Sequence, residues 1–146
     1  MAIAALVAWV LTAAGGFVML AKWISRGGLH QQHDATTRFP AGLVFGHLGL
    51  AAAGLVLWIA YLLLDNDRLA WIAFVVLLPV AGLGGGMFAR WGAGRRRAAV
   101  GVTPSGAATA GGALPAEQTL PVPVVAAHGV FAVATVVLVL LAALAG

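Results

Sequence analysis

The sequence predicts an all-α fold: a four-transmembrane-helix bundle built from two tandem helical hairpins. Three observations support it: the composition, four long apolar runs, and a repeat that relates the first two runs to the last two. Of the 146 residues, 62% are hydrophobic and 8% charged, whereas soluble domains are about half apolar and a quarter charged. Each run is long enough to cross a bilayer, and lipid offers backbone groups no partners, so each run is expected to be helical.

All 146 residues are assigned to a single membrane domain. The predicted helices are about residues 2–23, 40–64, 69–90 and 121–145, with a flexible cytoplasmic loop at about 92–120. The first run is followed, not preceded, by basic residues, so we expect a retained helix and not a signal peptide. Pro40 and Pro121 open the second and fourth runs, and Asp65 ends the second. The loop is rich in Gly, Ala, Thr and Pro, which are typical of irregular connections.

Seven of the eight basic residues lie in the first and third connectors. They are Lys22, Arg26, Arg38, Arg90, Arg95, Arg96 and Arg97. Short loops rich in Lys and Arg stay in the cytoplasm, so we predict a multi-pass protein of the plasma membrane with both termini outside. Trp23 and Trp91 are expected in the inner interfacial belt. The net charge of +4 therefore indicates orientation and not nucleic-acid binding, and the Arg-, Ala- and Gly-rich composition is typical of a bacterium.

Two ordered sets of residues recur along the chain. Met19, Lys22 and Trp23 recur as Met87, Arg90 and Trp91 at an offset of 68, and Pro40, Val44 and His47 recur as Pro121, Val125 and His128 at an offset of 81. The difference is an insertion in the third connector. Hairpins that cross the membrane in the same direction are related by an axis along its normal, so the sequence predicts parallel pseudo-twofold symmetry.

The repeat leaves one matched pair of ionisable residues inside the membrane, His47 and His128. Each lies seven residues after a helix-opening proline, or about 10 Å along its helix, so both are expected at one depth and facing the bundle interior. Their helices are diagonal in an up-down bundle, which we expect to keep the imidazoles too far apart to meet directly. A haem between them would fill the gap, since its iron takes two axial ligands. His47 and His128 are thus the predicted metal ligands.

The residues around the pair agree with a haem b site. Glycines near the same level, which let a flat ring approach closely, are Gly16, Gly46, Gly84 and Gly129. Basic residues nearer the cytoplasm, which are predicted to meet the propionates, are Lys22, Arg90 and Arg38.

Together these residues resemble the bis-histidine membrane b-type cytochromes, such as the cytochrome b561 type. The resemblance implies single-electron transfer, a quinone or a respiratory complex as redox partner, and an electron carrier or subunit instead of a self-contained enzyme. Those families often carry two haems on four histidines. Only one intramembrane pair is present here, so one haem is expected.

Other interpretations of the histidines stay open. They are hydrogen-bonding residues in a cofactor-free accessory subunit of a larger respiratory complex or a homo-oligomer, or ligands of copper together with Met19 and Met87. His30 and His33 are interpreted as part of a solvated segment instead of a metal site. The absence of cysteine excludes thiolate chemistry, and the absence of Asp and Glu from the spans disfavours a proton-coupled transporter.

Overall fold

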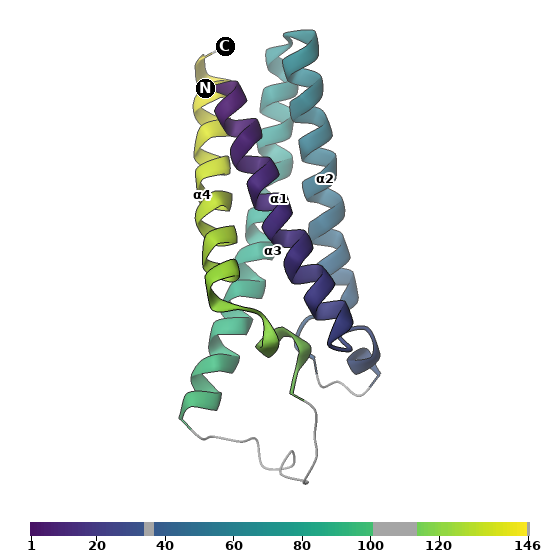
Figure 1. Ribbon diagram of the computed structural model, residues 1–146. Coiled ribbons are helices and arrows are strands. Elements are labelled where there is room, and N and C mark those ends of the chain that lie inside the picture. Colours follow the sequence, from purple (N-terminus) through teal and green to yellow (C-terminus); the bar gives the residue numbers. More distant parts are fainter. Residues whose placement is uncertain (34–36, 101–113, 146) are drawn as a thin grey trace.

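The computed structural model describes residues 1–33, 37–100 and 114–145, and it confirms the all-α fold with four long helices (Figure 1). The elements in chain order are α1 (Ala2–Ser25), η1 (His30–Gln32), α2 (Ala41–Leu64), α3 (Asp67–Ala99), η2 (Ala116–Thr119) and α4 (Val122–Ala145). All four α-helices are long and apolar enough to cross a membrane, and at most 17% of each span is buried within the bundle. Most apolar side chains therefore face outward, as expected for helices that lie in lipid.

Short polar sequences set the turn between α2 and α3. Asp65 ends α2 with a left-handed backbone, at a φ of 50°, which reverses the chain within two residues. The side chain of Asn66 then caps α3 by accepting a hydrogen bond from the Arg68 amide at 3.1 Å. Asp67 lies in the first turn of α3, where its negative charge interacts favourably with the helix dipole.

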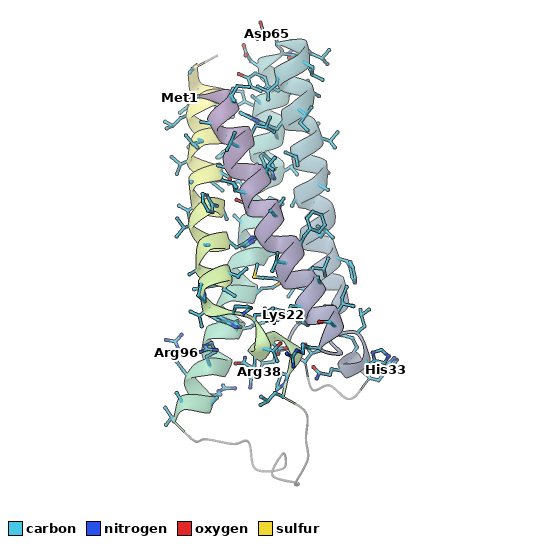
Figure 2. All side chains as sticks on the ribbon, in the orientation of Figure 1. Met1, Lys22, His33, Arg38, Asp65 and Arg96 are labelled. Atoms are coloured by element: carbon cyan, nitrogen blue, oxygen red, sulfur yellow. The ribbon has the colours of Figure 1, made fainter. Side chains whose placement is uncertain are left out.

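The four helices form an up-down bundle in which α2 and α4 are diagonal. α1 packs mainly along α4, and α2 packs mainly along α3, while α3 also contacts α4. The tightest pairings therefore join the two predicted hairpins to each other. Both termini lie at the same end as Asp65, and Lys22, Arg38 and Arg96 lie at the other end (Figure 2), so the two basic connectors share one end of the bundle.

The core has two layers. The layer near the termini is centred on Trp58, which is fully buried and donates its indole N–H to the Ala2 carbonyl at 3.3 Å. Next to it, the small Gly54 makes room for the Trp9 ring. The layer near the basic end contains the following residues: Trp23, Phe39, Trp91, Ala116, Leu120 and Val125. His47 lies next to the first of these layers, since its Nδ1 is 3.0 Å from the carbonyl oxygen of Val80, a residue of that layer.

The prediction of a flexible loop at 92–120 is wrong at both ends of that range, where the structure has helical turns. α3 continues to Ala99, because the Arg- and Ala-rich sequence after Trp91 consists largely of good helix formers. Arg95 also lies 5.3 Å from the Trp91 ring centre, a cation–π contact that favours this extra turn. At the other end, Ala116–Thr119 forms the 3₁₀ turn η2, while residues 101–113 lie outside the described part of the chain.

Glu117 holds the two basic connectors together. Its side chain is fully buried and accepts hydrogen bonds from the Thr37 hydroxyl and from the Arg38 amide, both at 2.8 Å. Gln31 adds a reciprocal pair, donating to the Leu114 carbonyl at 3.1 Å and accepting from the Ala116 amide at 2.8 Å. These bonds close the basic end of the bundle over the layer that contains Trp23 and Trp91.

Replacement of Glu117 by alanine is expected to destabilise the protein by about 2–4 kcal/mol, because two half-buried donors, the Thr37 hydroxyl and the Arg38 amide, lose their acceptor. Glu117→Gln keeps one carbonyl oxygen and is expected to cost less. Thermal unfolding of the purified protein in detergent measures both effects. An unfolding midpoint that Glu117→Ala leaves unchanged would show that the connectors are not held by this carboxylate.

Candidate functional site

His47 on α2 and His128 on α4 meet inside the bundle. Their ring centroids are 6.5 Å apart and their planes are inclined by 61°. The expectation that the two rings are too far apart to meet across the diagonal is therefore wrong. Two imidazoles bound on opposite sides of one metal ion have ring centroids about 6 Å apart when each metal–nitrogen bond is about 2 Å long. The separation of the His47 and His128 rings is close to this value.

Each imidazole is anchored to a backbone carbonyl of a neighbouring helix. His47 Nδ1 lies 3.0 Å from the Val80 carbonyl oxygen, and His128 Nδ1 lies 2.8 Å from that of Thr12. Since a carbonyl only accepts, each Nδ1 carries the hydrogen and donates it. In a neutral imidazole the Nε2 lone pair is then free, which is the usual state of a metal-binding histidine.

Gly16 and Gly84 provide the space for these rings. Thr12 and Val80 lie four residues before them, one helical turn away on the same face. A Cβ at Gly16 would lie 3.3 Å from His128 Cε1, and one at Gly84 would lie 3.1 Å from His47 Cε1. A larger residue at either position would push the imidazole away from its carbonyl. The structure thus brings both predicted glycines into contact with the histidines.

Gly46 and Gly129 differ from Gly16 and Gly84 because they do not contact the imidazoles. A Cβ at either position would have no atom of the described residues within 4 Å, so open space lies beside both. Each is next to a histidine in the chain, and successive residues on a helix point about 100° apart. Their place beside a cofactor stays a prediction.

The offsets of the repeat also relate the contacts around the two histidines. Thr12 and Gly16 correspond to Val80 and Gly84 at an offset of 68, and His47 corresponds to His128 at an offset of 81. His47 contacts α3 and His128 contacts α1, so each histidine binds a helix of the other hairpin. The site therefore requires both hairpins. The sequence alone did not indicate Thr12 and Val80, because their backbone carbonyls and not their side chains make the contact. The offset of 68, which relates Thr12 to Val80, was the one feature of the sequence that could have indicated them.

The predicted basic residues lie toward the connectors. Lys22 and Arg90 come six residues after Gly16 and Gly84, which is about 9 Å along the helix. Lys22 is half-buried and Arg90 is exposed. Arg90 donates to the Arg38 carbonyl at 3.4 Å. The structure thus gathers Arg38 and Arg90, with Lys22 at the same end (Figure 2), on one side of the histidine pair.

Trp23 and Trp91 are buried in the core layer at the basic end of the bundle. Their side chains are 2% and 7% exposed. In the part of the chain that the structure describes, neither indole Nε1 has a hydrogen-bond partner. Leaving a buried donor unpaired costs roughly 1–3 kcal/mol. We therefore expect both indole N–H groups to donate to an acceptor that is not among the described residues.

His30 and His33 do not extend the site. His30 lies on η1 and His33 directly after it, both exposed, and Asp34 is outside the described residues. Among residues 1–33, 37–100 and 114–145, no group of three or more His, Cys, Asp or Glu side chains is placed to hold a metal ion.

Comparison with known proteins finds no matching family model, curated protein or solved structure. The class of the protein is therefore defined by its fold and its site. It is a four-helix membrane protein with a paired-histidine centre inside the bundle.

Proposed function

We propose that the protein is an integral membrane b-type cytochrome that carries one haem b between His47 and His128 and transfers single electrons. The observation that carries the proposal is the geometry of the two imidazoles. Their ring centroids lie 6.5 Å apart, with the planes inclined by 61°. Each Nδ1 is held by a backbone carbonyl, which leaves the Nε2 lone pair of each ring available to a metal. Two protein ligands are the number that haem iron requires.

The surrounding residues support the same cofactor. Gly16 and Gly84 hold the imidazoles in place, and the Thr12 and Val80 carbonyls fix their orientation, as outer-shell partners of metal-bound histidines do. Bound haem supplies reversible one-electron chemistry. The apolar interior of the bundle keeps water from the centre, a factor that tunes the reduction potential of such sites.

A lipid-soluble redox partner such as a quinone is included in the proposal. A shallow, almost entirely apolar groove of about 390 Å³ runs between α1 and α4 and is lined by His128, Gly15 and Phe131 among others. This groove supports an approach from the side of the bilayer to one of the two ligands. A larger respiratory complex is the alternative partner, since most of the bundle surface is apolar.

Two other functions follow from the same residues. Met19 and Met87 lie partly buried beside Trp23 and Trp91, and two imidazoles with two thioethers would suit Cu(I). Alternatively, the imidazole–carbonyl bonds serve only to hold the helices together in a cofactor-free accessory subunit.

Spectroscopy of the purified protein in detergent tests the proposal. We expect a Soret band, a sharp α band on reduction, and one haem per chain by extraction. Metal analysis of the same sample distinguishes copper, which would appear without a haem spectrum. A colourless, metal-free and well-folded protein after expression with excess haem would contradict the proposed function and favour the accessory subunit.

A further inference from the structure

We infer that the indole N–H groups of Trp23 and Trp91 donate hydrogen bonds to the two propionates of the haem. This inference rests on the proposed function. It assigns a binding role to two residues that the histidine geometry does not involve.

The two indoles share an unusual state. They are repeat partners at an offset of 68, they are 2% and 7% exposed, and both Nε1 atoms lack a partner within the described residues. Trp58, also buried, shows that this chain satisfies an indole elsewhere, since its N–H donates to the Ala2 carbonyl. Both repeat positions thus carry the same unpaired donor in the part of the chain that the structure describes.

Among residues 1–33, 37–100 and 114–145, the groups packed around the indoles do not accept a hydrogen bond from either N–H. Their buried neighbours Phe39, Leu120 and Val125 are apolar. Glu117, the buried carboxylate of this layer, already accepts from the Thr37 hydroxyl and the Arg38 amide. A bound molecule with two acceptor groups would satisfy both N–H donors.

The position of the indoles fits the carboxylate edge of a haem held by the histidines. Trp23 and Trp91 come seven residues after Gly16 and Gly84, which contact the imidazoles. Seven residues are two helical turns, about 10 Å toward the basic end. Each indole is also preceded by a cation, Lys22 or Arg90. Two N–H donors and two cations thus lie toward the same end of the bundle as seen from the histidines, and they match two carboxylates in number and charge.

The chemistry favours carboxylates over a neutral acceptor. Hydrogen bonds to an ionised acceptor are shorter and about twice as strong as neutral ones, and burial strengthens them further. Two such bonds would also orient the haem, with its propionate edge toward the basic connectors.

Comparison of haem with its dimethyl ester tests this role. The ester keeps the iron and the ring but carries no charged carboxylate. We expect the wild-type apoprotein in detergent to bind haem at least about tenfold more tightly than the ester. Trp23→Phe and Trp91→Phe should each weaken haem binding about tenfold and leave ester binding unchanged. Trp71→Phe, at an exposed indole near the opposite end of the bundle, is the control and should change neither.

The outcomes separate the two proposals. If the wild type and both variants show the same preference for haem over its ester, the indoles bind water and the inference is wrong, although the haem site stands. If neither haem nor ester binds the wild type, the proposed function itself fails. Hydrogen exchange of the indole N–H groups provides a second readout: we expect haem, but not the ester, to slow exchange at Trp23 and Trp91, and equal exchange would also overturn the inference. Circular dichroism of each apoprotein checks that the variants fold.

Discussion

Substitution of either His47 or His128 by alanine is expected to abolish the haem spectrum and to leave the bundle folded. Each substitution removes one of the two axial ligands. The loss of haem affinity should exceed the roughly 10–100-fold effect of altering an outer-shell partner. The helices should persist, because the Val80 and Thr12 carbonyls lie within α3 and α1 and the imidazole is an additional donor to them. Haem content per chain and circular dichroism measure the two effects.

The connector histidines are the matched control. His30→Ala and His33→Ala remove exposed imidazoles and should leave the spectrum unchanged. His128→Met offers a positive test, because a His/Met pair raises the reduction potential of a haem. A full haem spectrum in His47→Ala or His128→Ala would show that the pair does not ligate the iron.

Replacement of Gly84 or Gly16 by leucine is expected to displace the facing imidazole and to reduce haem content strongly. The Cβ alone would lie 3.1 Å from His47 Cε1 at Gly84 and 3.3 Å from His128 Cε1 at Gly16, so the rest of a leucine side chain would occupy the place of the ring. Gly84→Ala requires a shift of only a few tenths of an ångström and should have a smaller effect. Haem-to-protein ratio and the position of the reduced α band report the change.

Gly86→Leu is the control on the same helix, since a Cβ there meets nothing within 4 Å. It adds the same side chain to α3 without touching His47, and we expect normal haem content. Equal haem content in Gly84→Leu and Gly86→Leu would mean that the His47 imidazole does not need the space beside Gly84. Because leucine favours helix more than glycine does, a loss of haem in Gly84→Leu would not reflect a weakened helix.

Much of the site was predictable because it depends on regular helices. The apolar runs and the charged connectors indicated four membrane spans, and the repeat placed His47 and His128 at one depth. The period of 3.6 residues also explains why Gly16 and Gly84 were good candidates. The same period directs Gly46 and Gly129 to a different side of their helices from the adjacent histidines, so neither contacts an imidazole.

The connectors were less predictable because their structure depends on contacts distant in sequence. Glu117 lies in a segment rich in Gly, Ala and Pro, yet it is buried by bonds to Thr37 and Arg38 in the other basic connector. The charged residues after Trp91 indicate the end of the membrane span, and the sequence therefore predicts a loop there, although these residues are helical. Charge ends a span, but the backbone hydrogen bonds of α3 continue into water.

By itself, the sequence determined the class of the protein, the four spans and the matched pair of histidines, because hydropathy and helical period act locally along the chain. Only the tertiary structure decided which helices pair. α1 packs with α4 and α2 with α3, so each histidine reaches a carbonyl of the other hairpin, and the rings meet at 6.5 Å. Packing of this kind depends on which faces fit together in space, and for these rings it depends on the missing side chains of Gly16 and Gly84.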